Sequence, residues 1–486
     1  MCGIAGYIGK SPVENEAITE TLKLMRNRGP DHRDFVNVKD GSVNIALLHS
    51  RLSIIDLNER SNQPFTIGDY TIVYNGEIYN YVELKKELKK RGVNFRTTSD
   101  VEVLLQYYIM FGEECVKDFE GMWSFVIYDK RNKKLFLSRD RFAEKPIYIL
   151  RMKDGIFFGS EVKFIRSLSR EHLVVNMDHL FRYLVNGYKS IYKTKETFFK
   201  GIEEVPYATN MVIGHDLNPV TYRYWSPTCQ PEKMGLNDAI EGFRHRLFES
   251  VKIRLRADVP LAFCLSGGID SGALASIAKK IFNYDVATFS IIDADERYNE
   301  YENIQKTIND LNCKHTILHV PQDIGFERLE KLVRYHDSPV YTISYYIHSF
   351  LSEVISKKGY KVAVSGTAAD ELVTGYYDHF ILHLYEMRGH PEYSSYLNDW
   401  ETNIKKFVRN PYLKNPNLYF DNPQFRDHIY LDNKEFAKYL KPKFNEPFQE
   451  KRYCDSLLRN RMLNELFHES IPVILHEDDL NSMFYS

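Results

Sequence analysis

Residues 261–271 read Leu-Ala-Phe-Cys-Leu-Ser-Gly-Gly-Ile-Asp-Ser, an apolar run followed by a loop of small residues, and helical spacing begins at Gly272. This order predicts a buried strand, a tight loop and a helix. Such a loop exposes backbone N–H groups at a helix N-terminus, where the helix dipole favours anions, and its glycines let a phosphate approach closely. The stretch therefore predicts either a phosphate-binding loop or a tight turn in which Ser266 or Asp270 only caps the helix.

Strands and helices alternate on both sides of this loop. The spacing of apolar residues predicts helices over 239–255 and 272–281, and strands over 260–265, 286–292 and 360–364. Strands that alternate with helices favour a parallel sheet with helices on both faces. We therefore expect an α/β domain in this half of the chain.

The first 205 residues follow a different pattern. Runs of β-branched and aromatic residues predict strands over 43–48, 70–74, 123–128, 134–138 and 155–159, with helices over 81–91 and 101–111. Turn signals bound these runs, which is typical of an α+β fold rich in antiparallel strands.

A stretch with several prolines, from Pro206 to Pro231, interrupts both patterns, and helical spacing starts again at Leu236. We therefore expect a first domain over 1–205, a linker over 206–235 and a second domain over 236–486. The 486 residues are enough for each domain to bury a full core.

Composition excludes several classes of function. Lys and Arg number 64 against 66 Asp and Glu, which gives a formal net charge of −2 and argues against nucleic acid as a partner. No stretch is apolar enough to span a membrane and no signal peptide is evident, so we expect a cytoplasmic protein. The six cysteines are scattered, so neither a disulfide framework nor a structural zinc site is expected.

Cys2 is a candidate nucleophile. Removal of the initiator Met would leave a cysteine whose thiol and free α-amino group share one residue. That amine has an ordinary pKa of ~7.7–8, so it can take the thiol proton and act as the base. Taken alone, Cys2 is better explained as an ordinary cysteine at the start of a first strand.

Four further segments support the nucleophile: Asn27–Asp31, His49–Asp56, Tyr74–Asn80 and Ser99–Asp100. In this order they resemble the motifs of the class II glutamine amidotransferases. The resemblance implies an Ntn-hydrolase-like sandwich in which the cysteine attacks the side-chain amide of glutamine, releases ammonia and leaves a thioester that water hydrolyses.

The resemblance also implies residue roles. Arg51 would hold the glutamine α-carboxylate, Glu77 and Asp100 the α-ammonium, and Asn75 with the Gly76 N–H would form the oxyanion hole. The full set implied to bind glutamine is Arg51, Leu52, Ser53, Ile54, Ile55, Asn75, Gly76, Glu77 and Asp100. Read singly, Asn75-Gly76 is a common turn and Arg51 a surface ion pair.

The loop after residue 265 resembles the pyrophosphate loop of ATP pyrophosphatases, which cleave ATP to AMP and pyrophosphate. A second segment, Ser365–Leu372, resembles the second signature of asparagine synthetase domains. Together they imply ATP binding by Leu265, Ser266, Gly267, Gly268, Asp270, Ser271, Ile291, Ser365 and Gly366, and Mg²⁺ binding by Asp270 and Asp370. Asp370 and Glu371 could otherwise be helix N-terminal charges.

Both halves in this order resemble the glutamine-hydrolysing asparagine synthetases. The resemblance implies a glutamine-dependent amide ligase that adenylates a carboxylate, by default aspartate, with Mg-ATP and then amidates it to asparagine. Its partners would be glutamine, ATP and the carboxylate acceptor, and the family allows a homodimer.

Two departures keep alternatives open. Thr367 stands where the family has a glutamate, so the acceptor could be another carboxylate, such as a sugar uronic acid of a surface polysaccharide. The family stretch normally runs on through an E-x-R-x-P-F motif to a lysine-bearing segment. Here we expect a helix that ends at Pro472 and a second domain that is cut short at Ser486. A glutaminase with an inactive synthetase half, or a non-catalytic interaction protein, are therefore rival hypotheses.

Overall fold

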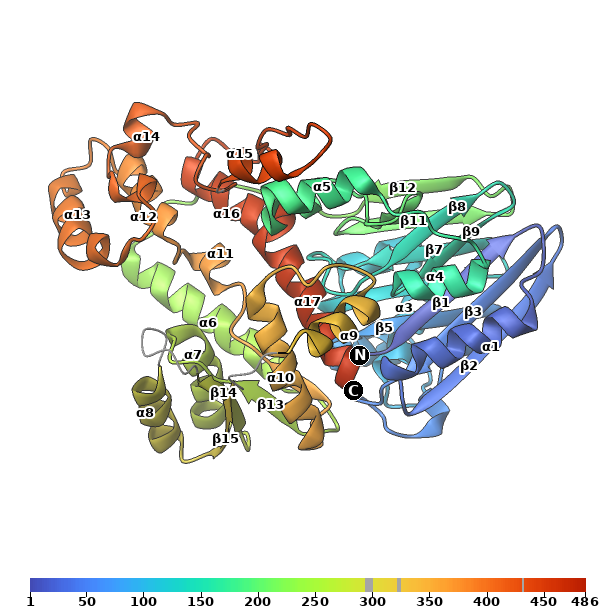
Figure 1. Ribbon diagram of the computed structural model, residues 1–486. Helices are drawn as coiled ribbons and strands as arrows, with labels where there is room; N and C mark the ends of the chain where they lie inside the picture. Colours follow the sequence, from blue (N-terminus) through green and yellow to red (C-terminus); the bar gives the residue numbers. More distant parts are fainter. Residues whose placement is uncertain (293–299, 321–324, 431) are drawn as a thin grey trace.

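The computed structural model describes residues 1–292, 300–320, 325–430 and 432–486. It contains two six-stranded antiparallel sheets formed within the first 223 residues and a four-stranded parallel sheet formed within residues 261–364. Figure 1 shows the antiparallel sheets on one side of the molecule, the parallel sheet on the other and the red C-terminal helix between them.

The first antiparallel sheet has β1 near its centre, paired with β3 and β9. Its order is β10-β8-β9-β1-β3-β2, formed by Ile202–Glu204, Tyr148–Met152, Gly155–Gly159, Gly3–Gly9, Val43–Arg51 and His32–Asp40. The second sheet has the order β12-β11-β7-β6-β5-β4, formed by Pro219–Arg223, Thr209–Gly214, Lys134–Arg139, Gly121–Asp129, Tyr70–Ile78 and Phe65–Ile67. Because β1 is internal, the residues next to Cys2 are fixed on both sides.

The two sheets pack face to face. Apolar side chains such as Ile4, Leu47 and Val126 fill the space between them. Helices α1 (Asn15–Leu24) and α4 (Val162–Ser169) cover the outer face of the first sheet, and α2 (Tyr81–Lys90) and α3 (Asp100–Phe111) cover the second. This four-layer arrangement is the α+β, Ntn-hydrolase-like sandwich that the sequence predicts.

The boundary of the first domain lies later than predicted. Strands β11 and β12 fall inside the predicted linker 206–235 and extend the second sheet to Arg223. Pro219 is the first residue of the edge strand β12, a position where the missing N–H costs no ladder hydrogen bond. Pro219 therefore opens a strand, whereas Pro227 and Pro231 lie in the irregular segment before the helix expected from Leu236, which is α6 (Leu236–Arg254).

The second domain contains the predicted parallel sheet with helices on both faces. Its order is β15-β14-β13-β16, formed by Lys314–His319, Ala287–Ile292, Leu261–Cys264 and Val362–Val364. Leu261 and Phe263 pack against α6 and α7 (Ile269–Ser276), whereas Ala262 packs toward α10 (Ile343–Lys357) on the other face. Helices α8 (Tyr301–Leu311) and α9 (Phe326–His336) belong to the same domain.

The remaining helices lie mostly after the parallel sheet. They are α5 (Met177–Asn186), α11 (Ala369–Val373), α12 (Tyr377–Glu386), α13 (Tyr393–Asp399), α14 (Leu418–Asp421), α15 (Asn433–Phe436), α16 (Leu457–His468) and α17 (Ser470–Tyr485). Among the described residues, no helix combines the length and the apolar character that crossing a membrane requires.

The expectation that a helix ends at Pro472 is wrong. Pro472 lies in the first turn of α17, where proline is tolerated because the N–H groups there have no partner within the helix. The helix then runs on to Tyr485 and reaches the first domain, where Asp479 pairs with Arg28 at 2.6 Å.

Candidate active sites

Cys2 lies directly before β1 in a small pocket whose walls come from both antiparallel sheets. The backbone N–H of Leu52 donates a hydrogen bond to its Sγ at 3.4 Å. Burial raises the pKa of the Cys2 thiol and lowers the pKa of the Met1 α-amino group to about 5. Burial therefore favours the neutral form of an amine at this place, and the Cys2 α-amine that removal of Met1 would expose remains the predicted base.

The pocket brings together most of the residues that the sequence predicts to bind glutamine. Its walls are Met1, Cys2, Arg51, Leu52, Ile54, Ile55, Ser61, Gln63, Tyr74, Gly76, Glu77, Ser99 and Asp100. Ser53 and Asn75 are not part of the wall, although both adjoin residues that are. The N–H of Ser53 instead donates to the carboxylate of Asp31 at 2.7 Å.

Arg51 ends β3 and is almost fully buried. Its Nη1 donates to the carbonyl of Asn58 at 2.9 Å and to Oδ1 of Asn62 at 2.8 Å, and its Nη2 donates to the carbonyl of Asp56. No carboxylate of the described residues forms an ion pair with it, so the surface ion-pair interpretation is wrong. A buried guanidinium held only by neutral acceptors can bind a substrate carboxylate.

Asn75 and Gly76 lie within β5, opposite Ser124 and Trp123 of β6, and so do not form a turn. Both atoms of the Asn75 side-chain amide are buried without a hydrogen-bond partner among the described residues. A Cβ at Gly76 would lie 2.2 Å from the carbonyl oxygen of Met122, so only glycine fits. An unpartnered buried amide that adjoins Gly76, a wall residue of the Cys2 pocket, is available to stabilise an oxyanion.

Glu77 and Asp100 bring two buried carboxyl groups to the same pocket. Burial and the nearby Asp100 raise the pKa of Glu77 to about 8, and burial also raises the pKa of Asp100. Asp100 accepts hydrogen bonds from Tyr74 Oη at 2.9 Å and from the N–H of Ile78 at 3.1 Å. Such a pair is suited to a substrate cation, which would relieve the repulsion.

The candidate phosphate loop joins β13 to α7 at the carboxyl edge of the parallel sheet, the usual ligand edge of such sheets. Ser271 Oγ accepts the N–H of Ser266 at 3.0 Å, and Ser266 Oγ accepts that of Gly268 at 3.2 Å. The N–H of Leu265 donates a hydrogen bond to the carbonyl of Phe289 in β14 at 2.8 Å, and Ile291 is the last residue but one of that strand.

Glu300 was not found from the sequence, which offers no signal for it. Its carboxylate accepts the N–H of Gly267 at 2.8 Å. The loop therefore holds an anion in this structure, which is the behaviour expected of a phosphate-binding turn.

The second loop follows β16, the strand beside β13, and packs closely on the first. A Cβ at Gly366 would lie 2.7 Å from the backbone nitrogen of Ser271. Burial and the charge of Asp270 raise the pKa of Asp370, so the two carboxylates are within electrostatic reach. No lysine or arginine of the described chain pairs with either, and two such oxygen donors fit Mg²⁺. Thr367 is exposed, and its hydroxyl lies 3.0 Å from that of Ser365.

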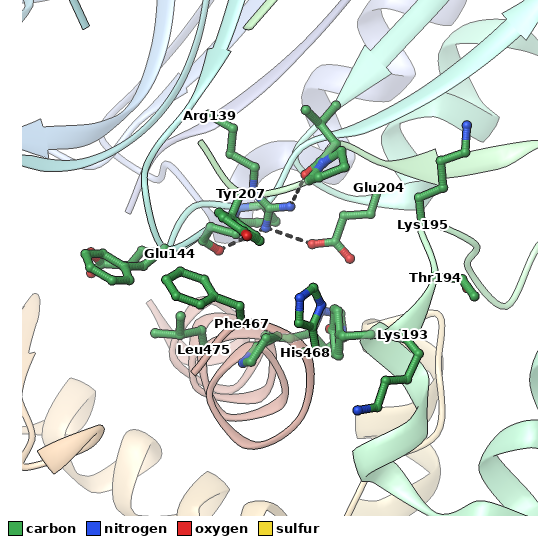
Figure 2. A pocket seen from close by; sticks show the side chains of 18 of the residues that line it. Arg139, Glu144, Lys193, Thr194, Lys195, Glu204, Tyr207, Phe467, His468 and Leu475 are labelled. Atoms are coloured by element: carbon green, nitrogen blue, oxygen red, sulfur yellow. Dashed lines mark hydrogen bonds and ion pairs between the residues drawn. The ribbon is translucent and has the colours of Figure 1, made fainter. Parts of the chain in front are cut away.

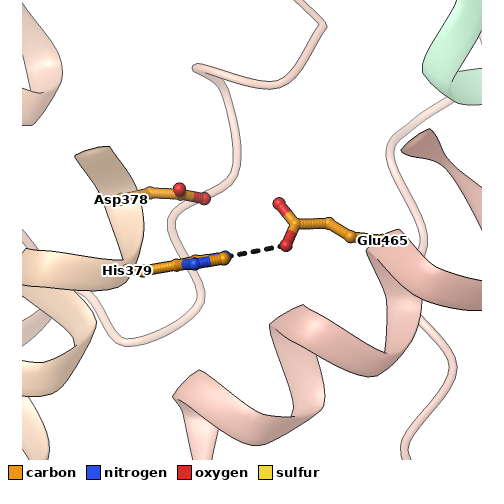
Figure 3. A group of neighbouring side chains, drawn as sticks. All are labelled: Asp378, His379 and Glu465. Carbon is orange, nitrogen blue, oxygen red and sulfur yellow. Dashed lines mark hydrogen bonds and ion pairs between the residues drawn. The ribbon is translucent and has the colours of Figure 1, made fainter. Parts of the chain in front are cut away.

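Sequence reasoning also missed a buried group of charges between α12 and α16. Figure 3 shows His379 directed at Glu465, with Nε2 2.7 Å from the carboxylate, and Asp378 beside them. Arg461 lies 3.6 Å from Asp378 and makes a further ion pair with Glu469. Because Arg461 supplies the positive charge, the group is a structural ion network rather than a metal site.

A larger cavity of about 310 Å³ lies between the first domain and helices α16 and α17. Figure 2 shows Arg139 paired with Glu204 on one wall, at 2.7 Å, and Phe467 on the opposite wall. None of the residues predicted to bind glutamine or ATP lines it. The sequence gives no signal for this cavity, because its walls come from distant segments.

Comparison with known proteins assigns a domain to each half. Residues 1–225 match a glutamine amidotransferase domain family, and residues 242–469 match the asparagine synthase family.

Curated relatives cover most of the chain. Asparagine synthetase [glutamine-hydrolyzing] 1 of Bacillus subtilis is 30% identical, with 77% of this chain and 59% of the relative aligned. Putative asparagine synthetase [glutamine-hydrolyzing] 2 of Methanocaldococcus jannaschii is 29% identical, with 94% and 91% aligned. The chain thus spans about three fifths of the Bacillus relative and nearly all of the Methanocaldococcus one.

Among solved structures, the glutamine phosphoribosylpyrophosphate amidotransferase of B. subtilis aligns with a TM-score of 0.35 and 13% identity, over 65% of this chain and 81% of that chain. The two family matches follow one another in the order that the motifs predict. With a glutamine amidotransferase domain followed by an asparagine synthase domain, the chain belongs to the family of glutamine-hydrolysing asparagine synthetases.

Proposed function

We propose that this chain is a glutamine-dependent amide ligase. It hydrolyses glutamine to ammonia at Cys2, adenylates a carboxylate with Mg-ATP and amidates it, with aspartate as the default acceptor and asparagine as the product. One observation carries the proposal: the Cys2 pocket combines a guanidinium without a carboxylate partner and two buried carboxyl groups, and the unpartnered amide of Asn75 adjoins its wall residue Gly76. These groups complement the two charges and the side-chain amide of glutamine.

The glutamine half of the reaction follows from that pocket. Arg51 binds the α-carboxylate and Glu77 with Asp100 the α-ammonium, which places the side-chain carbonyl carbon at Cys2 Sγ. The Cys2 α-amine, once Met1 is removed, takes the thiol proton and the sulfur attacks the amide carbon. Asn75 and the Gly76 N–H hold the oxyanion, the carbon–nitrogen bond breaks, and ammonia leaves with the proton.

The nucleotide half lies at the ends of β13 and β16. The Ser266–Gly268 turn offers backbone N–H groups to the phosphates, in the place where Gly267 now binds the carboxylate of Glu300. Asp270 and Asp370 would hold Mg²⁺, which would supply positive charge to the phosphate oxygens. The role of Leu265 and Ile291 near the adenosine stays a prediction.

Thr367 supports a second candidate acceptor. Its neutral, exposed hydroxyl puts no negative charge beside the second loop, where the family has a glutamate. Amidation of another carboxylate, such as a sugar uronic acid, is therefore the alternative ligase activity. The cytoplasmic location and a homodimer also stay predictions.

The test uses the purified chain with glutamine and Mg-ATP and compares aspartate, glucuronate and no acceptor. Glutamate, pyrophosphate and the amide product are measured together. Aspartate-dependent pyrophosphate with asparagine supports the default, and glucuronate-dependent pyrophosphate supports the alternative. Glutamate without pyrophosphate would leave a glutaminase with an inactive synthetase half. The Cys2→Ala variant should lose glutamate release while free ammonia still supports pyrophosphate release.

A further inference from the structure

One loop of the glutamine pocket packs against the synthetase domain. The segment 51–56, here called the glutamine loop, carries three apolar side chains that pack on that domain. The contacting residues are Leu52, Ile54 and Ile55 on one side and Ala257, Val259 and Val362 on the other. The loop that binds substrate in one domain is therefore supported by the other.

Asp258 of the synthetase domain holds the end of this loop. Its carboxylate accepts the N–H of Asp56 at 2.7 Å, and its own N–H donates to the carbonyl of Ile54 at 2.9 Å. Asp56 has a φ of 53°, a left-handed conformation that non-glycine residues adopt only when their surroundings hold them. The carbonyl of Asp56 in turn accepts a hydrogen bond from Arg51. Asp56 thus connects Asp258 to the guanidinium that faces the glutamine pocket.

Lys361 supports the start of the same loop through Asp31. Its Nζ lies 2.7 Å from Asp31 Oδ2, the oxygen that also accepts the N–H of Ser53 at 2.7 Å. The N–H of Asp31 donates to the carbonyl of Arg51 at 3.0 Å. Asp31 is therefore hydrogen-bonded to the loop on both sides of Leu52. Lys361 of the other domain forms an ion pair with Asp31 and holds it in place.

We propose that Asp258 and Lys361 are positioning residues of the glutamine site: they hold the glutamine loop in the shape that directs Arg51 at the α-carboxylate of glutamine. The inference rests on the proposed glutaminase activity and deepens it. Asp258 stands shortly before β13, and Lys361 directly before β16, which pairs with β13. The nucleotide loops follow the other ends of the same two strands. The glutamine site and the nucleotide site are therefore both attached to β13 and β16.

The variants Asp258→Ala and Lys361→Met test the proposal, with glutamate release measured against glutamine concentration. Each should raise the KM for glutamine about tenfold, equivalent to about 1.4 kcal/mol, and leave kcat within about twofold. Asp258→Asn keeps an oxygen that accepts the Asp56 N–H and should restore the KM. The exposed residues Asp285 and Lys358 do not touch the loop, so Asp285→Ala and Lys358→Met serve as matched controls.

A binding measurement separates positioning from general damage. Iodoacetamide alkylates Cys2 without needing Arg51, so the unprotected rate should be the same in every variant. The glutamine concentration that halves this rate should rise about tenfold in Asp258→Ala and Lys361→Met only. An unchanged protecting concentration would overturn the inference, and so would a faster unprotected rate, which indicates an opened pocket.

The two proposals fail in different ways. If the unsubstituted chain releases no glutamate, the glutaminase proposal fails, while glutamine protection of Cys2 still decides whether Asp258 and Lys361 position the loop. If glutamate is released and the variants retain the original KM, only the positioning role fails.

Discussion

Glu77 and Asp100 bury two carboxyl groups in one pocket, and no cationic side chain of the described residues pairs with either. Burial and the charge of Asp100 together raise the pKa of Glu77 to about 8. The pocket therefore favours a cation, the role that we propose for the α-ammonium of glutamine.

Glutamine binding should depend on pH through Glu77. Below pH 8 Glu77 is protonated when no substrate is bound. Binding of the α-ammonium favours the ionised carboxylate, so Glu77 must release this proton. We expect the affinity of the Cys2→Ala protein for glutamine, measured by calorimetry, to rise about tenfold from pH 6 to pH 7 and to level off above pH 8. The Glu77→Gln change should weaken binding and flatten this profile. A slope that persists in Glu77→Gln would assign the pH dependence to another group.

The same pKa makes a prediction for stability. The folded pKa of about 8 exceeds the ordinary value of 4.5, so between these pH values the folded protein binds more protons than the unfolded one. Stability contributed by this group is therefore present below pH 4.5 and is lost as pH rises toward 8. Glu77→Gln should remove that part of the decline, which denaturant unfolding at pH 5 and pH 8 would detect.

The close approach of the two nucleotide loops leaves no room at Gly366. A Cβ there would lie 2.7 Å from the nitrogen of Ser271 and 3.0 Å from its Cα. Gly366→Ala should therefore separate the loops and lower ATP-dependent pyrophosphate release at least tenfold. Gly242→Ala is the control, because a Cβ at this helical position meets nothing within 4 Å and should stabilise α6 by about 0.5–1 kcal/mol. Full activity in Gly366→Ala would mean that the loops need not touch.

Asp370 should matter only when Mg-ATP is present. Burial and Asp270 raise its pKa, so Asp370→Asn removes a like-charge repulsion and should not lower the melting temperature of the free protein. We expect Mg-ATP to raise the melting temperature of the original chain, and the same change should abolish this rise. Asp285→Asn, on an exposed residue before β14, should retain that rise. Retention by Asp370→Asn would remove Asp370 from the metal site.

Arg461 should be essential for stability. Its fully buried guanidinium pairs with Glu469, and with Glu450 at 2.7 Å. Arg461→Met removes the fully buried cation of the network and leaves only Lys193 beside Glu469 and Arg426 beside Glu450. It should lower the free energy of unfolding by about 3 kcal/mol, measured with urea. Arg452→Ala removes an ion pair whose side chains are more than four-fifths exposed and should change it by less than about 0.5 kcal/mol. Equal effects of the two changes would contradict the structural role of the buried network.

Local patterns allowed much of the fold to be predicted. The strand expected over 155–159 is β9, and the helix expected over 101–111 is α3, which begins at Asp100. The loop after β13 was also predicted, because apolar spacing and small turn residues act over a few neighbours. The edge strand β12 and the first turn of α17 were missed, because proline marks both breaks and element starts.

The sequence by itself determined the order of strands and helices and the nature of both loops, through side-chain periodicity and motifs that are contiguous in the chain. Only the tertiary structure decided which distant groups meet: Arg28 with Asp479, Lys361 with Asp31, and the carboxylate of Asp258 with the backbone N–H of Asp56, 202 residues away. Such pairs depend on how helices and sheets pack, and packing joins residues whose separation along the chain carries no pattern.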